Sequence, residues 1–420
     1  MVNKNQVRCY ACERILTIRV TVSGGVQEFV FPCPYCSAQL SGTFYAEQPT
    51  GDPTEELPQK DIELKSEDFD YVQYDPELET QEMRVVAIST ELPVHKSMLA
   101  EPYGASSFSV FLQLMKLPGS TGATIEVVDS VNLLRQMRFE MLPAVRRAAV
   151  FYGRGEMDLL SRELAKFPGF AESPLSDEDP WTAVSIILQG FLLVLGARDV
   201  SQAARRELGV LLETAYAADE DATRRLLDEL TERTLREHRR AVIDTLIRSL
   251  LRSDALVPGM WVEALPEATL DEYRTQRADY DDVKTRFQEI FELGSRSLVL
   301  PASLANIVHR GDARHYTDGK RFSLRKALNL KAATREAWLE ELPALKEVFD
   351  DRARVTRNLI GHRLVSYDFK DAVLIDNDGN RYNYLRFLRD YLSAVRSCGH
   401  QLDVVAILTN IEQDEGHSQR

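Results

Sequence analysis

The 420-residue sequence has few of the residue types that most often form cross-links or active sites: five cysteines and seven histidines. Four cysteines form two close pairs and the fifth, Cys398, is isolated. This pattern is a poor basis for a disulfide framework and indicates a reducing compartment, so we expect a cytoplasmic protein. The start of the chain has no apolar segment of the kind found in secretory signals. We also find no phosphate-binding glycine loop, no nucleophile–base pattern in the middle region and no fixed-period repeat.

Long apolar runs are also scarce. The longest uncharged run, "WTAVSIILQGFLLVLGA" at 181–197, is at the lower limit of a membrane span and has Gln189 and Gly190 at its centre. We interpret it as a buried core helix and expect no membrane partner; a transmembrane helix is the alternative. The net charge of -14 argues against a general affinity for nucleic acid. The length predicts roughly two to four folded units.

The paired cysteines indicate a metal site. Cys9–Cys12 and Cys33–Cys36 are two C-x2-C pairs separated by 20 residues. Each pair forms a tight turn that directs two thiolates at one ion, and two such turns complete a tetrahedral zinc site. We therefore expect one structural Zn²⁺ on Cys9, Cys12, Cys33 and Cys36, and no cofactor for catalysis.

The chain between the pairs predicts a β-hairpin. "RILTIRVTV" alternates, "SGG" marks a turn, and "VQEFVF" returns as a second strand. A hairpin this short cannot bury a core, so the metal should supply much of its stability. Residues 7–41 resemble a zinc ribbon. Nucleic acid and protein both remain open as its ligand.

Residues 47–82 are strongly acidic, with 13 Asp or Glu against Lys60 and Lys65, and contain four prolines. Such a segment is typical of an extended linker. It is either a spacer or an acidic strand that covers a basic groove until RNA displaces it.

The middle region reads as α-rich after two strands, at 83–89 and 123–128. The segment "SFSVFLQLM" between them is ambiguous. Helical periodicity begins near Val131, with Pro143 as a break, and resumes at about Trp181. Its function is left open.

A further helix is predicted to begin at Pro343. One face of this helix is predicted to carry Leu345, Val348, Arg352, Val355 and Leu359, and His362 continues that face. His362 could therefore be a core or interface histidine, with Arg357 on the surface and Gly361 ending the helix.

The segment "RNLIGH", Arg357 to His362, also has a functional interpretation. The chain contains two other Arg-x4-His pairs, Arg233…His238 and Arg310…His315, but only this one has Asn after the arginine and an apolar helix before it. The following hairpin, "AVLIDNDGNRYNY", and the last helix, "YLRFLRDYLSAVRSC", complete the pattern. Residues 280–415 thus resemble a HEPN domain.

This resemblance implies a metal-independent endoribonuclease of the toxin–antitoxin or anti-phage defence type. His362 would be the acid/base, Arg357 the phosphate clamp and Asn358 a polar helper, leaving 2′,3′-cyclic phosphate and 5′-hydroxyl ends. The expected partners are RNA, a second copy of the chain and possible antitoxin or other defence-system proteins. Five residues on an ideal helix place side chains about 140° apart, so we expect a homodimer or a distortion at Gly361.

A basic stretch supports RNA as a partner. Residues 309–335 carry eight Arg or Lys against Asp312 and Asp318. The candidate RNA-binding residues are Arg310, Arg314, Lys320, Arg321, Arg325 and Lys326. An ordinary solvated helix and loop is the alternative.

The sequence thus predicts a mainly α multidomain protein. We expect a zinc ribbon at 1–45, an acidic linker at 46–82, an α-rich middle region with a few strands at 83–270 and a HEPN-like α-bundle with a β-hairpin insertion at 280–415. The alternatives to a ribonuclease are a non-catalytic HEPN-like dimeric adaptor that binds RNA or protein, and a zinc-ribbon interaction protein in which the C-terminal match is accidental.

Overall fold

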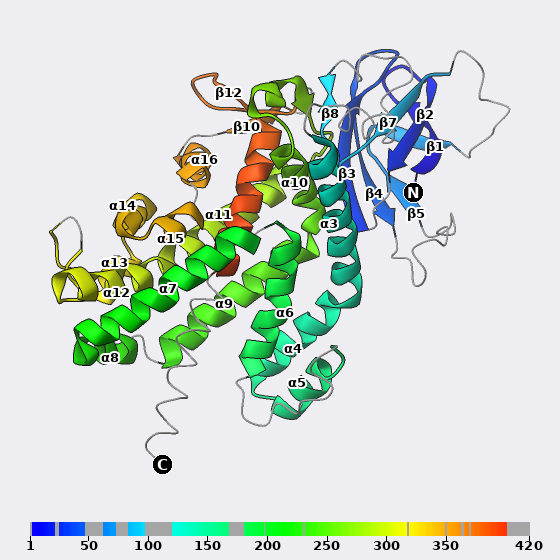
Figure 1. Ribbon diagram of the computed structural model, residues 1–420. Coiled ribbons are helices and arrows are strands. Elements are labelled where there is room, and N and C mark those ends of the chain that lie inside the picture. The colour runs from blue at the N-terminus through cyan, green and yellow to red at the C-terminus, as the bar shows by residue number, and fades with distance from the viewer. Residues whose placement is uncertain are drawn as a thin grey trace. The chain divides into compact units, whose positions relative to one another are not determined.

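The computed structural model describes residues 2–21, 25–46, 62–72, 83–96, 120–167, 180–196, 198–229, 232–316, 319–348, 351–362, 365–368 and 371–400. The chain is mainly helical with several small sheets (Figure 1). It divides into two compact units, each built from segments that are distant in sequence. Unit 1 comprises Met1–Asp129, Asp254–Lys284 and Leu359–Arg389, and unit 2 comprises Ser130–Ser253, Thr285–Asn358 and Asp390–Arg420. The predicted domain ranges stay a prediction.

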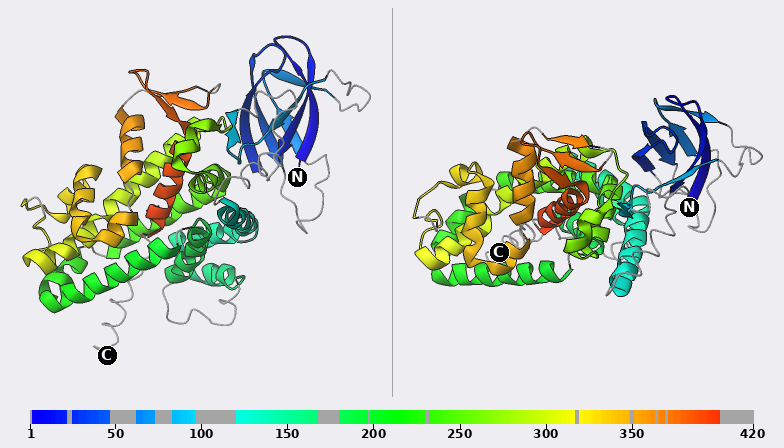
Figure 2. Two further views of the ribbon diagram at one scale, coloured as in Figure 1. Left: turned by 45° about the horizontal axis from the view of Figure 1, so that its top comes forward. Right: turned by 90° about the horizontal axis from the view of Figure 1, so that it is seen from above.

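The strands found among the described residues all lie in unit 1. They are β1 (Val2–Cys9), β2 (Ile15–Thr21), β3 (Gly25–Pro32), β4 (Gln39–Ala46), β5 (Ile62–Lys65), β6 (Phe69–Val72), β7 (Val85–Ile88), β8 (Val94–His95), β9 (Tyr273–Arg274), β10 (Ser366–Asp368), β11 (Val373–Ile375) and β12 (Arg381–Asn383). Two sheets come from the N-terminal segment, with strand orders β6-β1-β2-β7 and β3-β4-β5. The blue strands of these sheets lie together in both views of Figure 2.

The predicted pairing of the two strands between the cysteine pairs is wrong. These strands are β2 and β3, and they belong to different sheets. β2 pairs antiparallel with β1 and parallel with β7, whereas β3 pairs antiparallel with β4. The strands β1 and β4 were not predicted, since "VNKNQV" and "QLSGTFYA" have few apolar residues in alternation. Each C-x2-C pair therefore lies at the turn of its own hairpin.

The two N-terminal sheets also bury a core, contrary to the expectation that this region is too short to bury one. Its members lie on β1, β2, β3, β4, β6 and β7 and at the cysteine turns: Val7, Cys9, Leu16, Ile18, Val20, Phe29, Phe31, Cys33, Leu40, Phe44, Phe69 and Ile88. Close packing leaves no room at Gly42, where a Cβ atom would lie 2.8 Å from the Phe29 ring. The hydrophobic effect thus contributes to the stability of these sheets alongside any metal.

Residues 62–72 are an exception to the expected acidic linker. β5 pairs with β4, and β6 pairs with β1. Phe69, one of three aromatic residues in "FDYVQY", is 3% exposed and packs into the core, whereas Tyr71 is 52% exposed. Strand pairing and burial of Phe69 outweigh the repulsion among the acidic side chains here. Residues 47–61 and 73–82 lie outside the described residues.

The predicted C-terminal hairpin is confirmed. β11 pairs antiparallel with β12, and β10 adds a third strand. The turn is organised by Asp376, whose carboxylate accepts the backbone N–H groups of Asp378 at 3.0 Å and Asn380 at 2.9 Å. Gly379 has φ 80°, a conformation that glycine adopts without strain.

A buried charged cluster joins the three segments of unit 1. Arg277 is 1% exposed and donates hydrogen bonds to the carboxylates of Asp254, at 3.0 Å, and of Asp279, at 3.0 Å from Nε. It also donates to the Asp254 carbonyl at 2.9 Å and lies 3.5 Å from the Thr90 carbonyl. The Tyr367 hydroxyl donates to the Arg277 carbonyl at 2.9 Å. The cluster thus connects the N-terminal segment, residues 254–284 and the β10 strand.

The helices provide most of the remaining structure, largely in unit 2. They are α3 (Ser120–Glu140), α4 (Leu142–Arg154), α5 (Met157–Leu164), α6 (Pro180–Val194), α7 (Arg198–Ala218), α8 (Glu220–Glu229), α9 (Glu232–Leu251), α10 (Val257–Glu263), α11 (Tyr280–Ser297), α12 (Val299–Arg310), α13 (Leu324–Leu328), α14 (Ala332–Ala337), α15 (Pro343–Val348) and α16 (Asp351–His362), with short 3-10 turns η3 (Ser253–Ala255), η4 (Glu267–Glu272) and η5 (Trp338–Glu341). Residues 384–400 form a last helix.

Most helix predictions are confirmed. The helix is interrupted at Met141, between α3 and α4, and Pro143 occupies the first turn of α4. α6 begins at Pro180, and Leu188 and Phe191 on it are fully buried, as expected for a core helix. Among the described residues, no helix combines the length and apolar character that crossing a bilayer requires.

The predicted strand at 123–128 is wrong. These residues lie in α3. Residues 125–128 are all exposed or half-buried, without the alternation of a half-buried strand. The helical segment that follows extends through them, so the β-branched residues Ile125, Val127 and Val128 do not decide the local structure. The ambiguous segment 107–115 lies outside the described residues.

The core of unit 2 is formed by α7, α8, α12, α13, α15 and the residues around η5. The green helix α7 runs beside α12 and α15 in Figure 1. Trp338 stacks on Tyr316 with ring centroids 3.8 Å apart. Arg335 is 1% exposed and donates to Ser295 and to the carbonyl of Leu328. One cation of the predicted basic stretch is therefore part of the core.

The predicted apolar face after Pro343 does not continue as expected. Leu345 on α15 is buried, but Val355 on α16 is 62% exposed. Leu345 lies on α15 (Pro343–Val348) and Val355 on α16 (Asp351–His362), so the predicted face is divided between two described helices. Among the α16 residues whose burial is described, Ala353 and Ile360 are the buried ones.

We predict that Arg277→Ala will destabilise unit 1 by about 3–5 kcal/mol, because it leaves the Asp254 and Asp279 carboxylates buried without their cation. Urea unfolding followed by circular dichroism measures the effect. Arg314→Ala is the control: Arg314 makes an exposed ion pair with Glu229, and its loss should cost under about 1 kcal/mol. Equal effects of the two variants would contradict this role for Arg277.

Candidate functional site

The two cysteine turns have the same backbone geometry. In the first turn, the Glu13 N–H donates to the Cys9 carbonyl at 2.8 Å, and the Cys9 N–H donates to the Arg14 carbonyl at 3.1 Å. In the second, Ser37 and Ala38 make the equivalent bonds with Cys33, at 2.8 and 2.7 Å. The residue after each second cysteine has a positive φ, 59° at Glu13 and 62° at Ser37. The left-handed backbone at Glu13 and Ser37 closes each turn, so the two thiols of a pair point to the same side.

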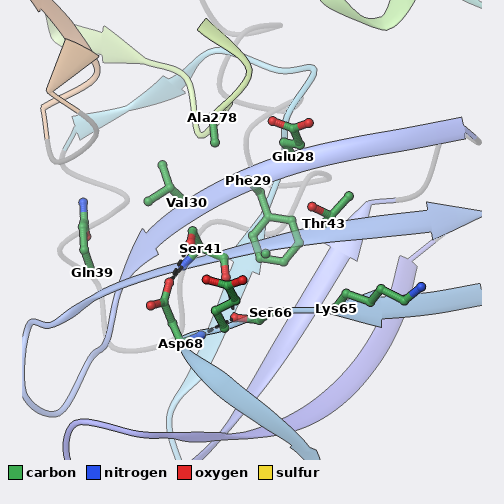
Figure 3. Close-up of a pocket in the computed structure, with 12 residues that line it drawn as sticks. Glu28, Phe29, Val30, Gln39, Ser41, Thr43, Lys65, Ser66, Asp68 and Ala278 are labelled. Atoms are coloured by element: carbon green, nitrogen blue, oxygen red, sulfur yellow. Dashed lines mark hydrogen bonds between the residues drawn. The ribbon is translucent and has the colours of Figure 1, made fainter. Parts of the chain in front are cut away.

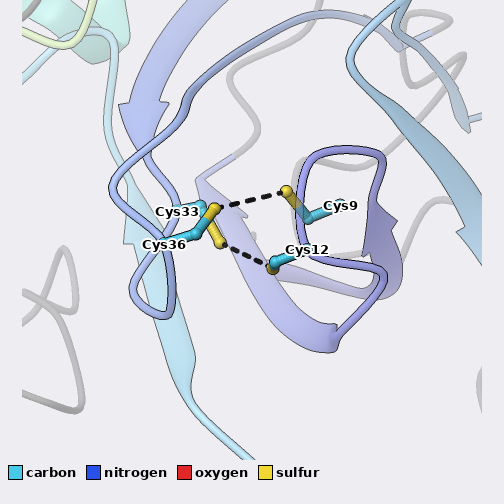
Figure 4. A group of neighbouring side chains, drawn as sticks. All are labelled: Cys9, Cys12, Cys33 and Cys36. Carbon is cyan, nitrogen blue, oxygen red and sulfur yellow. Dashed lines mark hydrogen bonds between the residues drawn. The ribbon is translucent and has the colours of Figure 1, made fainter.

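The four thiols converge on one point (Figure 4). Cys9 Sγ lies 3.9 Å from Cys36 Sγ, and Cys12 Sγ lies 3.8 Å from Cys33 Sγ. All four sulfur atoms lie within 4.8 Å of one another. A tetrahedral ion with Zn–S bonds of about 2.3 Å requires sulfur atoms about 3.8 Å apart. The cluster therefore fits a metal such as zinc and is compatible with a zinc ribbon.

The environments of the thiols differ. Burial raises the pKa of Cys33 to about 12, whereas the backbone N–H of Ala38 lowers the pKa of Cys36. A thiol as buried as Cys33 gives up its proton readily only to a cation that takes the proton's place. With four protein sulfurs close together, the donor set leaves no ligand position for a substrate, as in structural sites.

The residues of the predicted nuclease motif lie on α16. The Arg357 side chain is 27% exposed, and its guanidinium forms an ion pair with Glu292 on α11. Asn358 is exposed. Gly361 lies inside the helix and does not end it, contrary to the alternative considered above. His362 is the last residue of α16, and its side chain lies outside the described residues.

Comparisons of the chain with protein-family models, curated proteins and solved structures found no match.

The predicted RNA-binding residues lie on α12, α13 and the loop between them, and several are engaged with carboxylates. Arg310 contacts Glu341 at 2.6 Å, and Arg314 contacts Glu229 at 2.9 Å. Arg321 contacts Asp312 at 3.1 Å. The Lys326 ammonium lies over the Phe322 ring, 5.1 Å from its centroid, while Arg325 and Lys320 are exposed. The local charge is thus lower than the sequence count indicated.

The histidines of the other two Arg-x4-His pairs make contacts within the fold. His238 lies 3.1 Å from the Ser297 hydroxyl, and burial, with a contribution from Arg296, lowers the pKa of His238 to about 4. His315 forms an isolated β-bridge with Arg321. An imidazole that stays neutral down to about pH 4 is poorly suited to act as a general acid at neutral pH.

A cavity of about 740 Å³ lies over β3, β4 and the β5–β6 connection (Figure 3). Asp68 accepts hydrogen bonds from the Ser41 N–H at 2.7 Å and the Ser41 hydroxyl at 2.6 Å, and these bonds hold the connection in place. Its lining includes the carboxylates of Glu28, Glu67 and Asp68 against the single ammonium of Lys65. This charge suits a cation and disfavours the phosphates of RNA.

Sequence analysis missed the side chains that surround the cysteine turns. Each turn carries a tyrosine, Tyr10 or Tyr35. The guanidinium carbons of Arg14 and Arg84 lie 5.1 and 5.5 Å from the centroid of the Tyr35 ring. The tyrosine in each C-x2-C pair was a signal in the sequence that these turns carry aromatic side chains. The contact between Arg84 and Tyr35 could not be predicted from the sequence, because the two residues are 49 positions apart.

We predict that the purified chain contains about one zinc ion and that Cys33→Ser loses it, because a hydroxyl does not replace a thiolate ligand. Cys398→Ala is the matched control and should retain the ion, since Cys398 is buried and is not one of the four clustered cysteines. Metal content is measured by mass spectrometry after gel filtration. Equal zinc content in the two variants would contradict the assignment.

We predict that His238 makes stability depend on pH. Its folded pKa, about 4, lies below its unfolded value of about 6.5, so the unfolded chain binds a proton first and stability falls as the pH drops through this window. Between pH 7 and pH 5, His238→Gln should lose about 1–2 kcal/mol less than the wild type. Melting curves at both pH values test this. A parallel fall in both proteins would show that His238 is not buried in its neutral form.

Proposed function

We propose that the chain is a metal-independent endoribonuclease of HEPN type that acts as a toxin or anti-phage defence effector. The observation that supports this most is the placement of Arg357, Asn358 and His362 in the last two turns of one helix, α16. Asn358 is exposed and position 362 follows it by one helical turn, so these two positions share a face. Arg357 is partly exposed beside them.

The chemistry needs no metal ion. The ribose 2′-hydroxyl attacks the adjacent phosphorus, its proton passes to a base, and the 5′-oxygen leaves with a proton from an acid. This gives a 2′,3′-cyclic phosphate and a 5′-hydroxyl end. An imidazole titrates in the neutral range and suits both proton transfers, which assigns His362. The planar guanidinium of Arg357 suits the charge that develops on the phosphate oxygens.

The ion pair between Arg357 and Glu292 sets a condition for this role. The guanidinium presents five N–H donors, so it can keep a carboxylate on one edge and bind a phosphate with another. Glu292 would then orient the guanidinium. RNA must still compete with a carboxylate for the same cation, which weakens the clamp.

We further propose that the active site is formed by two copies of the chain. Positions five apart on a helix point about 140° away from each other, so one helix does not direct both side chains of Arg357 and His362 at one phosphate. Two α16 helices facing each other would bring the arginine of one copy to the histidine of the other. A homodimer is therefore part of the proposal.

A second candidate is a non-catalytic adaptor with the same dimeric arrangement and a zinc-bearing interaction module. The ion pairs favour it. Arg357 is paired with Glu292, and Arg310, Arg314 and Arg321 of the basic stretch are also paired with carboxylates. Cations used within the protein are less available to hold a phosphate.

We expect the purified protein to cleave mixed RNA in the presence of EDTA during a brief incubation that leaves zinc bound. His362→Ala and Arg357→Ala should each lower the rate by at least about 100-fold, because each removes one of the two groups that act on the phosphate. Gel electrophoresis measures cleavage, and light scattering measures the oligomeric state.

His315→Ala is the matched control, because His315 also ends an Arg-x4-His pair and should leave the rate unchanged. RNA binding without cleavage by the wild type would favour the adaptor. Cleavage that is equal in all variants would reject the nuclease, and an active monomer would reject the two-copy site.

A further inference from the structure

The end of unit 1 that holds the cysteine cluster presents aromatic and cationic side chains together. Tyr10 lies in the first cysteine turn and is 52% exposed, so most of its ring is open to solvent. Its hydroxyl donates to the Asp70 carboxylate at 2.6 Å, which holds the ring in one orientation. An exposed tyrosine that is fixed at its polar tip offers a flat apolar surface at a low cost in side-chain entropy.

The second turn supplies a mixed stack. The Tyr35 ring has the guanidinium of Arg14 at 5.1 Å and that of Arg84 at 5.5 Å from its centroid. The backbone N–H of Arg84 donates to the Tyr35 hydroxyl at 2.9 Å, and its guanidinium donates to the Pro34 carbonyl. Arg14 and Arg84 are exposed residues, whereas Tyr35 is half-buried and packs against the core, so solvent reaches the two arginines more readily than the Tyr35 ring.

The cysteine cluster lies where the two turns meet. Tyr10 lies between Cys9 and Cys12, and Tyr35 lies between Cys33 and Cys36, whose sulfurs approach to 3.9 and 3.8 Å across the two turns. A bound metal would therefore fix the spacing of the two rings. Tyrosine rings and guanidinium planes at one rigid end form a platform on which bases stack, while the guanidinium N–H groups face the backbone phosphates.

We propose that this zinc-end surface, defined by Tyr10, Arg14, Tyr35 and Arg84, binds single-stranded nucleic acid. Single strands are favoured over duplexes because only unpaired bases offer a free face for stacking. Glu13 lies in the first cysteine turn, and Asp70 on β6 contacts Tyr10. These two carboxylates keep the local positive charge small, so binding depends on stacking as well as on phosphate contacts. The proposal does not rest on nuclease activity.

The test measures fluorescence anisotropy of a short labelled oligodeoxyadenylate with the full chain at about 50 mM salt. DNA has no 2′-hydroxyl, so it resists the cleavage proposed above and reports binding alone. The wild type should bind the single strand more tightly than the same sequence in a duplex. Tyr10→Ala and Arg14→Ala should each weaken binding about tenfold. Tyr10→Phe keeps the ring but loses its hydrogen bond to Asp70, so it should weaken binding less than Tyr10→Ala does.

Tyr45→Ala is the matched control. Tyr45 is 37% exposed and has the Lys65 ammonium 5.1 Å from its ring centroid, but it lies on β4 away from the cysteine turns. Zinc content is measured for every variant, so that loss of the metal is not mistaken for loss of a contact. A 2′-O-methyl RNA strand in a parallel arm shows whether RNA or DNA binds better.

Failure of the wild type to bind single strands, or equal binding by Tyr10→Ala, Arg14→Ala and Tyr45→Ala with zinc retained, would overturn the proposal. So would binding of a protein partner by this surface without any binding of nucleic acid. Cleavage of RNA that depends on His362, together with unchanged binding by Tyr10→Ala, would reject the zinc-end surface and leave the nuclease proposal standing.

Discussion

The guanidinium of Arg277 is the contact on which unit 1 depends. It is buried, and it donates to the carboxylates of Asp254 and Asp279 and approaches the carbonyl of Thr90. The backbone carbonyl of Arg277 accepts a hydrogen bond from the Tyr367 hydroxyl. These residues come from all three segments of the unit. A buried cation is stable only when several acceptors surround it, so the cluster specifies that the three segments come together in one arrangement. The unit is therefore held by one satisfied polar cluster in addition to apolar packing.

The cysteine cluster acts at the end of this unit in a different way. Each pair closes a β-hairpin through a turn with a left-handed residue, Glu13 or Ser37. The two hairpins belong to different sheets that share an apolar core. A metal bound to all four thiols would join the sheets at their turns and fix the side chains on those turns, including Tyr10 and Tyr35. A structural ion would thus determine the geometry of a binding surface without taking part in chemistry.

The charges in unit 2 limit what its cations can do. Arg335 is buried in the core, Arg310 and Arg314 pair with glutamates, and Arg357 pairs with Glu292. In a chain with a net charge of -14, RNA binding requires local sites that overcome a general repulsion. Stacking on tyrosines at the zinc end would supply attraction that does not depend on net charge. In this proposal the zinc-end surface binds the nucleic acid and the Arg357–His362 motif cleaves RNA, so no single basic groove has to do both.

The sequence by itself determined the features that depend on short-range spacing: the four-cysteine cluster, a helix break near Pro143, a core helix from about Trp181 and the hairpin at Asn377–Gly379. Turn chemistry and helical periodicity act over a few residues, so they can be read directly. Only the tertiary structure decided that β2 and β3 belong to different sheets, that residues 62–72 are strands, that 123–128 is helical, and that Arg357 meets Glu292, 65 positions away. These outcomes depend on which distant segments pack together, and the free energy of that packing outweighs local propensity.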